Sequence, residues 1–124
     1  MERYFTVEEA NAALEVIRPL AAEMLELRQS LLERQAQEHP AVQQAKGNGG
    51  SRAASRLVED FNHLEGLVQR IQETGALVKD VNTGLLDFPT LREGREVYLC
   101  WRYNEPSVQF WHEMDAGFTG RQEL

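Results

Sequence analysis

The sequence predicts an α+β protein in which a long antiparallel helical hairpin precedes a small antiparallel sheet of two β-hairpins. Two observations predict this order. Apolar residues recur at helical spacing over most of residues 6–75, and the pattern changes to alternation within residues 76–115. Helices followed by strands are typical of α+β architecture. The 124 residues fit a single domain, composed of the helical hairpin 6–75, the β-hairpin region 76–115 and a C-terminal tail, 116–124.

A capping box opens the first predicted helix. The Thr6 hydroxyl can accept a hydrogen bond from the Glu9 amide, and the Glu9 carboxylate can reach back to the Thr6 amide. A heptad seam of apolar residues, the pattern of coiled coils, then runs over residues 7–31. The helix is expected to reach about Gln37, because His39-Pro40 ends or interrupts the pattern.

A glycine-rich segment separates the two predicted helices. Residues 46–51, KGNGGS, are expected to form a flexible tip. Ser51 or Ser55 would cap the second helix, whose apolar residues over 57–71 repeat the seam spacing of the first, and Gly75 would end it. Two amphipathic helices joined in this way pack antiparallel.

Two β-hairpins are expected after the helices. Residues 77–81 and 84–88 flank an Asn82-Thr83 turn, and Pro89 is expected to end the second of these strands. Residues 96–102 and 107–113 alternate around a turn at 104–106 and form the second hairpin.

The charge balance disfavours two classes of partner. The chain has 13 basic and 20 acidic side chains, a formal charge of −7, and the acidity is spread over both halves. Without a basic stripe, nucleic acid and an anionic membrane surface are poor partners. No apolar run approaches the length of a membrane span, and no signal peptide is recognisable, so a cytoplasmic protein is expected.

Residues able to bind a metal crowd into one short stretch. His112, Glu113 and Asp115, completed by Asp87 or alternatively by Asp80 or Glu105, could hold a divalent metal ion. Adjacent residues of a strand point to opposite faces, however, so His112 and Glu113 could share one ion only across a bulge. The alternative is a hydrogen-bonded structural histidine near a strand end.

The only cysteine, Cys100, cannot form an internal disulfide. Across neighbouring strands it could lie near His112, the arrangement that an activated thiol requires. The alternative is a small buried apolar residue.

Aromatic and basic residues of the last quarter are the other ligand-binding candidates: Trp101, Arg102, Trp111 and Arg121. An exposed aromatic face could stack on single-stranded bases, although core packing is the commoner use of such residues and the acidic charge opposes nucleic acid. Arg92 and Arg95, with Arg121, form either an anion site or ordinary ion pairs.

Several motifs resemble those of a bacterial family of uncharacterised proteins, domain of unknown function 2203. The motifs are Phe5-Thr6-x-Glu8-Glu9-Ala10-Asn11, Gly84-Leu85-Leu86-Asp87-Phe88-Pro89, Leu99-Cys100-Trp101-Arg102, Glu105-Pro106 and Phe110-Trp111-His112-Glu113-x-Asp115-x-Gly117-Phe118-x-Gly120-Arg121-Gln122. The resemblance covers essentially the whole chain. It implies a small bacterial cytoplasmic protein with no assigned activity and no catalytic residues to carry over.

Two functions are consistent with these features. The first is a non-enzymatic scaffold or interaction protein that forms a homodimer through the heptad seam and recognises a protein partner with its C-terminal hairpin. The second is a metal- or small-ligand-binding protein, with hydrolase activity as one possibility, built on the segment 111–115. An enzyme is the less favoured reading, because the sequence contains no complete catalytic constellation.

Overall fold

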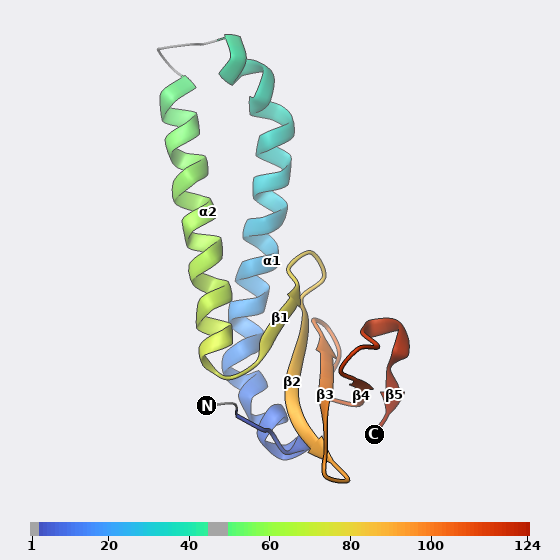
Figure 1. The fold of residues 1–124 in the computed structure, drawn as a ribbon. Coiled ribbons are helices and arrows are strands. Elements are labelled where there is room, and N and C mark those ends of the chain that lie inside the picture. The colour runs from blue at the N-terminus through green and yellow to red at the C-terminus, as the bar shows by residue number, and fades with distance from the viewer. Residues whose placement is uncertain (1–2, 45–49) are drawn as a thin grey trace.

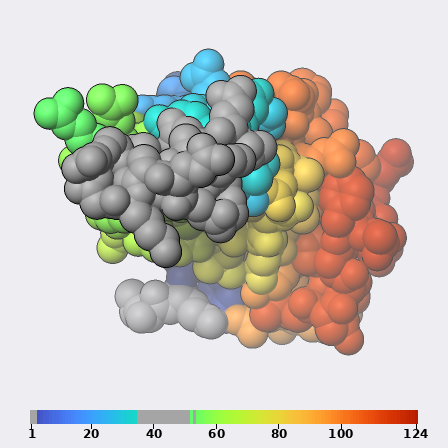
Figure 2. Space-filling model, turned by 90° about the horizontal axis from the view of Figure 1, so that it is seen from above, coloured from blue at the N-terminus to red at the C-terminus, as the bar shows by residue number. Residues whose placement is uncertain are grey.

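The computed structural model describes residues 3–44 and 50–124, and it confirms the α+β order. Two antiparallel helices, α1 (Val7–Gln44) and α2 (Gly50–Glu73), lead into a five-stranded sheet (Figure 1). The sheet lies beside the first part of α1, and the other end of the helical hairpin extends beyond it (Figure 1). Viewed along the hairpin, the strands and the tail form one side of the molecule (Figure 2). Neither helix, over the residues described, combines the length and apolarity needed to cross a membrane.

The helix ends follow the sequence signals in part. The capping box is present: the Glu9 amide donates to Oγ1 of Thr6 at 3.0 Å and the Thr6 amide to Oε1 of Glu9 at 2.9 Å. Gly75 follows the end of α2 with a φ of 104°, which favours glycine.

The structure differs from the predicted helix boundaries at three points. The prediction that α1 ends near Gln37 is wrong, because the helix continues to Gln44. A proline removes one backbone hydrogen bond from a helix, and the remaining hydrogen bonds are sufficient for α1 to continue past Pro40. Within the predicted tip, residues 46–49 lie outside the described part of the chain, and residues 50–51 already belong to α2. The prediction that Ser51 or Ser55 caps the second helix is wrong, because both residues lie within α2, which includes Gly50.

The heptad seam of α1 is buried inside the chain's own core. It packs against α2 and against one face of the sheet, and its buried members are Ala10, Leu14, Ile17, Ala21, Met24 and Leu31. The partners are Leu64, Leu67 and Ile71 of α2 and Leu86, Phe88, Val97, Leu99 and Trp101 of the sheet. The seam therefore supplies the hydrophobic driving force for folding of a single chain.

The strands form one antiparallel meander in the order β1 to β5. They are β1 (Leu77–Asp80), β2 (Leu85–Arg92), β3 (Arg95–Arg102), β4 (Phe110–Glu113) and β5 (Gln122–Glu123). Pairing of β2 with β3 joins the two predicted hairpins into one sheet. The last predicted strand begins at Phe110 instead of residue 107, and the tail contributes a short 3-10 helix, η1 (Phe118–Gly120), and β5.

The prediction that Pro89 ends its strand is wrong, since β2 continues to Arg92. On the β1 side of β2, strand pairing ends at Asp87. Pro89 lies beyond this point, where β1 needs no hydrogen bond from the nitrogen of residue 89, so a proline is tolerated. On this part of β2, the amino-terminal segment forms hydrogen bonds in place of β1. The Phe5 amide donates to the Pro89 carbonyl at 2.7 Å, and Oγ1 of Thr90 donates to the Phe5 carbonyl at 2.6 Å.

Strand alternation gives the sheet two different faces. The helix face packs on α1 and α2 and carries Trp111 together with the sheet residues of the core. The outer face, on the other side, carries Asp87, Cys100 and His112, three of the residues considered above for chemistry.

A buried aspartate, cysteine and histidine on the outer face

Three neighbouring strands bring Asp87, Cys100 and His112 together. Asp87 of β2 is the register partner of Cys100 of β3, and His112 of β4 lies on the same face, opposite Tyr98. One ligand atom from each, the carboxylate oxygen, Sγ and a ring nitrogen, lies within 4.8 Å of the others, and all three residues are buried. We refer to these residues as the Asp–Cys–His cluster.

Both ring nitrogens of His112 are engaged. Nδ1 lies 2.7 Å from the Glu113 carbonyl oxygen, which can only accept, so Nδ1 carries a proton and donates it. Nε2 lies 2.9 Å from Oδ1 of Asp87, with one proton between the two atoms. The pair is almost fully shielded, with side-chain exposures of 2% and 3%. His112 is thus held in one orientation by two hydrogen bonds and is not free to act as a base.

The Cys100 thiol is protonated at neutral pH. Burial raises the pKa of the thiol to about 12, and the charge of Asp87 adds to the rise while Arg121 opposes it. Because the thiolate is the nucleophilic form, this environment disfavours a catalytic cysteine. The structure confirms that Cys100 lies near His112, and it also agrees with the alternative interpretation of Cys100 as a small buried residue.

This raised pKa predicts how the thiol behaves with pH. The contribution of Cys100 to stability is fully present below pH 9.0, the ordinary pKa value, and is lost as the pH rises to about 12. We expect a thiol reagent at pH 8 to modify the protein in urea but scarcely at all in the folded state. Cys100→Ser should remove the part of the alkaline destabilisation between those two values, as measured by thermal melts. Equal reaction rates for folded and unfolded protein would contradict the burial of this thiol.

Arg121 and Glu105 lie against the cluster. The guanidinium makes a two-pronged ion pair with the Glu105 carboxylate at 2.6 and 2.8 Å, and its Nη2 is 3.3 Å from the Cys100 carbonyl. Burial raises the pKa of Glu105, but the hydrogen bonds from Arg121 and from the Arg102 amide outweigh this effect, so the net pKa lies below its ordinary value. The positive charge nearest the cluster is therefore balanced by its own carboxylate.

Of the four predicted metal ligands, the structure brings two together. Asp87 and His112 meet, whereas Glu113 forms an ion pair with Arg95 and Asp115 is exposed. The reason is the alternation of the strand, which turns Glu113 away from the side of His112. Cys100 occupies the third position of the cluster instead.

The four predicted ligand-binding residues are divided between the two faces. Trp101 is buried on the helix face, where its Nε1 donates to the Glu105 carbonyl at 3.0 Å, and Trp111 is buried on the same face. Arg121 lies on the outer side over the ring of Phe110, and the exposed Arg102 lies over Phe118. These residues do not form one site, although Trp111 belongs to a cavity considered below.

One comparison with known proteins gives a match. A family model with the description "Uncharacterized conserved protein (DUF2203)" matches residues 3–124. No curated protein and no solved structure matches the chain.

Proposed function

We propose that this chain, which belongs to the DUF2203 family of uncharacterized conserved proteins, binds a divalent transition metal in the Asp–Cys–His cluster, with zinc as the ion of best fit. The supporting observation is the convergence of a carboxylate oxygen, a thiol sulfur and an imidazole nitrogen within 4.8 Å. Zinc takes these three donor types, whereas magnesium and calcium prefer oxygen alone.

The spacing suits zinc after small side-chain shifts. Zinc–ligand distances of about 2.0–2.3 Å in a tetrahedral site separate the ligand atoms by roughly 3.3–3.8 Å. Ligand atoms separated by up to 4.8 Å would therefore have to approach by about 1 Å. Nε2 of His112 and Oδ1 of Asp87, now 2.9 Å apart, would instead have to separate to about 3.3 Å as zinc replaces the proton between them. A movement of this size needs only side-chain adjustment, because all three residues lie on paired strands with a fixed register.

Charge also favours the proposal. A thiolate from Cys100 and the carboxylate of Asp87 together balance a divalent cation, and a neutral His112 adds no charge. The loaded site would be electroneutral, which lowers the cost of its burial. Nδ1 of His112 already donates to the Glu113 carbonyl, the outer contact that orients most metal-binding histidines.

Three protein ligands leave the fourth position of a tetrahedral zinc to water, and a hydrolase would also need its substrate to reach that position. All three side chains of the cluster are buried, and Arg121 lies against Cys100. We therefore propose binding without catalysis.

The test uses near-isosteric variants. Cobalt(II) added to metal-free protein should give a thiolate-to-cobalt absorption band, and native mass spectrometry with zinc should show one ion per chain. Cys100→Ser and Asp87→Asn should weaken binding by at least about 10- to 100-fold, since even the loss of an outer contact costs this much. Asp115→Asn is the matched control, because it makes the same change at an exposed position.

Two outcomes would refute the proposal. One is folded wild-type protein that shows neither the cobalt band nor a zinc mass shift. The other is equal binding by Asp87→Asn and Asp115→Asn. Circular dichroism of each metal-free variant checks that it is folded, so that a lost site is not confused with a lost fold.

We also propose self-association, through a different surface from the one the sequence suggested. The heptad seam is buried within the chain, but Leu32, Val58 and Phe61 are 43%, 58% and 37% exposed on the helices. A homodimer would cover these side chains. The same mass spectra report the oligomeric state, and a monomer at all concentrations would exclude the dimer without affecting the metal proposal.

A further inference from the structure

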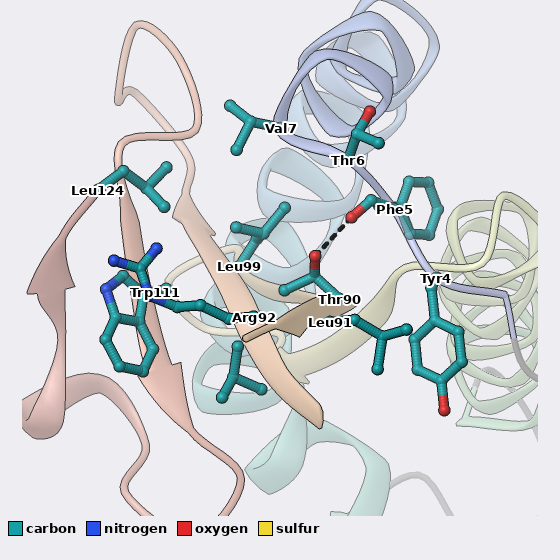
Figure 3. Close-up of a pocket in the computed structure, with 11 residues that line it drawn as sticks. Tyr4, Phe5, Thr6, Val7, Thr90, Leu91, Arg92, Leu99, Trp111 and Leu124 are labelled. Atoms are coloured by element: carbon teal, nitrogen blue, oxygen red, sulfur yellow. Dashed lines mark hydrogen bonds between the residues drawn. The ribbon is translucent and has the colours of Figure 1, made fainter. Parts of the chain in front are cut away.

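We infer that a cavity between the start of α1 and the helix face of the sheet binds a small-molecule carboxylate with an apolar body. The cavity has a volume of about 390 Å³ and is lined by residues 4–7, the end of β2, two side chains of β3, Trp111 and Leu124 (Figure 3). This volume falls in the lower range of small-molecule sites. The cavity lies on the opposite side of the sheet from the Asp–Cys–His cluster, so the inference is independent of metal binding.

The walls are apolar, and apolar side chains also gather at the rim. Phe5, Val7 and Leu99 contribute to the lining. Leu91 and Leu124, which are 53% and 45% exposed, border the same cavity. Exposed apolar residues that surround a cavity favour a ligand with a substantial apolar part.

Two donors on one side of the cavity lack acceptors. Nε1 of Trp111 is buried and has no hydrogen-bond partner within the described chain, and Trp111 as a whole is 7% exposed. The Arg92 guanidinium lies 4.5 Å from the centroid of the Trp111 ring, and none of the carboxylates whose side chains the structure describes forms an ion pair with it. Figure 3 shows the indole nitrogen and the guanidinium next to each other. An indole N–H beside a cation fits the two oxygens of a carboxylate.

The polar groups of Phe5, Thr6 and Thr90 beside the cavity are already used. The Thr90 hydroxyl donates to the Phe5 carbonyl, and the Phe5 amide donates to the Pro89 carbonyl. The Thr6 hydroxyl accepts from the Glu9 amide. One charged end and apolar walls elsewhere favour a monocarboxylate with a short hydrocarbon body over a free phosphate or a sugar.

The experiment follows the two indole N–H signals of ¹⁵N-labelled protein during titration with octanoate. Trp101 is an internal control, because its Nε1 already donates to the Glu105 carbonyl. We expect the Trp111 signal to move and saturate while the Trp101 signal stays in place. Octanol, which has the same chain without the charge, and inorganic phosphate, which has charge without a chain, should each bind more weakly than octanoate.

Arginine variants locate the anion. Arg92→Gln should weaken octanoate binding by about tenfold or more, the usual effect of a lost charge-assisted hydrogen bond. Arg95→Gln is the matched control, since Arg95 faces Arg92 across the same hairpin and is paired with Glu113. Three results would overturn the inference: an unmoved Trp111 signal at millimolar octanoate, equal affinity of the two arginine variants, or equal binding of octanol and octanoate.

Discussion

His112→Ala is expected to lower the free energy of unfolding by about 3–5 kcal/mol, because it leaves the Asp87 carboxyl buried without its partner. The side chains of His112 and Asp87 are 2% and 3% exposed, and Nε2 lies 2.9 Å from Oδ1. In the wild-type fold, Asp87 is shielded from solvent that could replace this hydrogen bond. The removal of the ring also leaves a cavity between the strands, which adds to the loss.

The measurement is urea unfolding in the presence of a chelator, so that the value reports the metal-free pair. His63→Ala is the control: Nε2 of His63 lies 3.3 Å from Oε1 of Glu23, with side-chain exposures of 52% and 50%. An exposed pair contributes about 0–1 kcal/mol. If the two alanine variants lose similar stability, the His112–Asp87 pair does not have the structural role assigned to it.

Phe88→Ala is expected to lower the free energy of unfolding by a similar amount, about 3–5 kcal/mol. The ring of Phe88 is fully buried on the helix face and meets the ring of Phe5 edge to face at a centroid distance of 5.1 Å. Its loss would empty the space between the amino-terminal segment and β2. This effect comes from lost packing, whereas that of His112→Ala comes from an unpaired polar group.

The same urea titration measures it, at a concentration at which native mass spectrometry shows a monomer, with Phe61→Ala as the matched change on α2. Phe61 is 37% exposed, so its truncation removes fewer contacts, and a loss of about 1 kcal/mol or less is expected. A loss at Phe61 equal to that at Phe88 would place the main hydrophobic core in the helical hairpin alone.

Local patterns in the sequence predicted most of the fold. Three predictions from local patterns were confirmed. They are the helix predicted from the spacing of the α1 seam, the turn between β1 and β2 at Asn82-Thr83, and the end of α2 near Gly75. The errors at Pro89 and Pro40 have different causes. Pro89 lies where no hydrogen bond from its nitrogen is required, and this depends on strand pairing that the local sequence does not specify. Pro40 does cost α1 one hydrogen bond, but the loss of one bond does not end the helix.

The candidate site was predicted only in part for a related reason. Alternation along one strand shows which residues share a face, but it does not show which residue of the next strand lies opposite. Asp87, Cys100 and His112 meet because three strands pair in one register. Proximity of Cys100 to His112 was anticipated, whereas the choice of Cys100 over Glu113 and Asp115 follows from that register.

The closure of the amino-terminal segment on β2 has a consequence for the order of folding. Every strand pairs with a neighbour in the chain, so the helical hairpin and the meander can each form from nearby segments at low entropic cost. The contact of Phe5 with Thr90 joins residues 85 positions apart, and such long loops close more slowly. We therefore expect the two halves to form first and to dock last. The cavity beside Trp111 has walls from both halves, so it would be completed only in this final step.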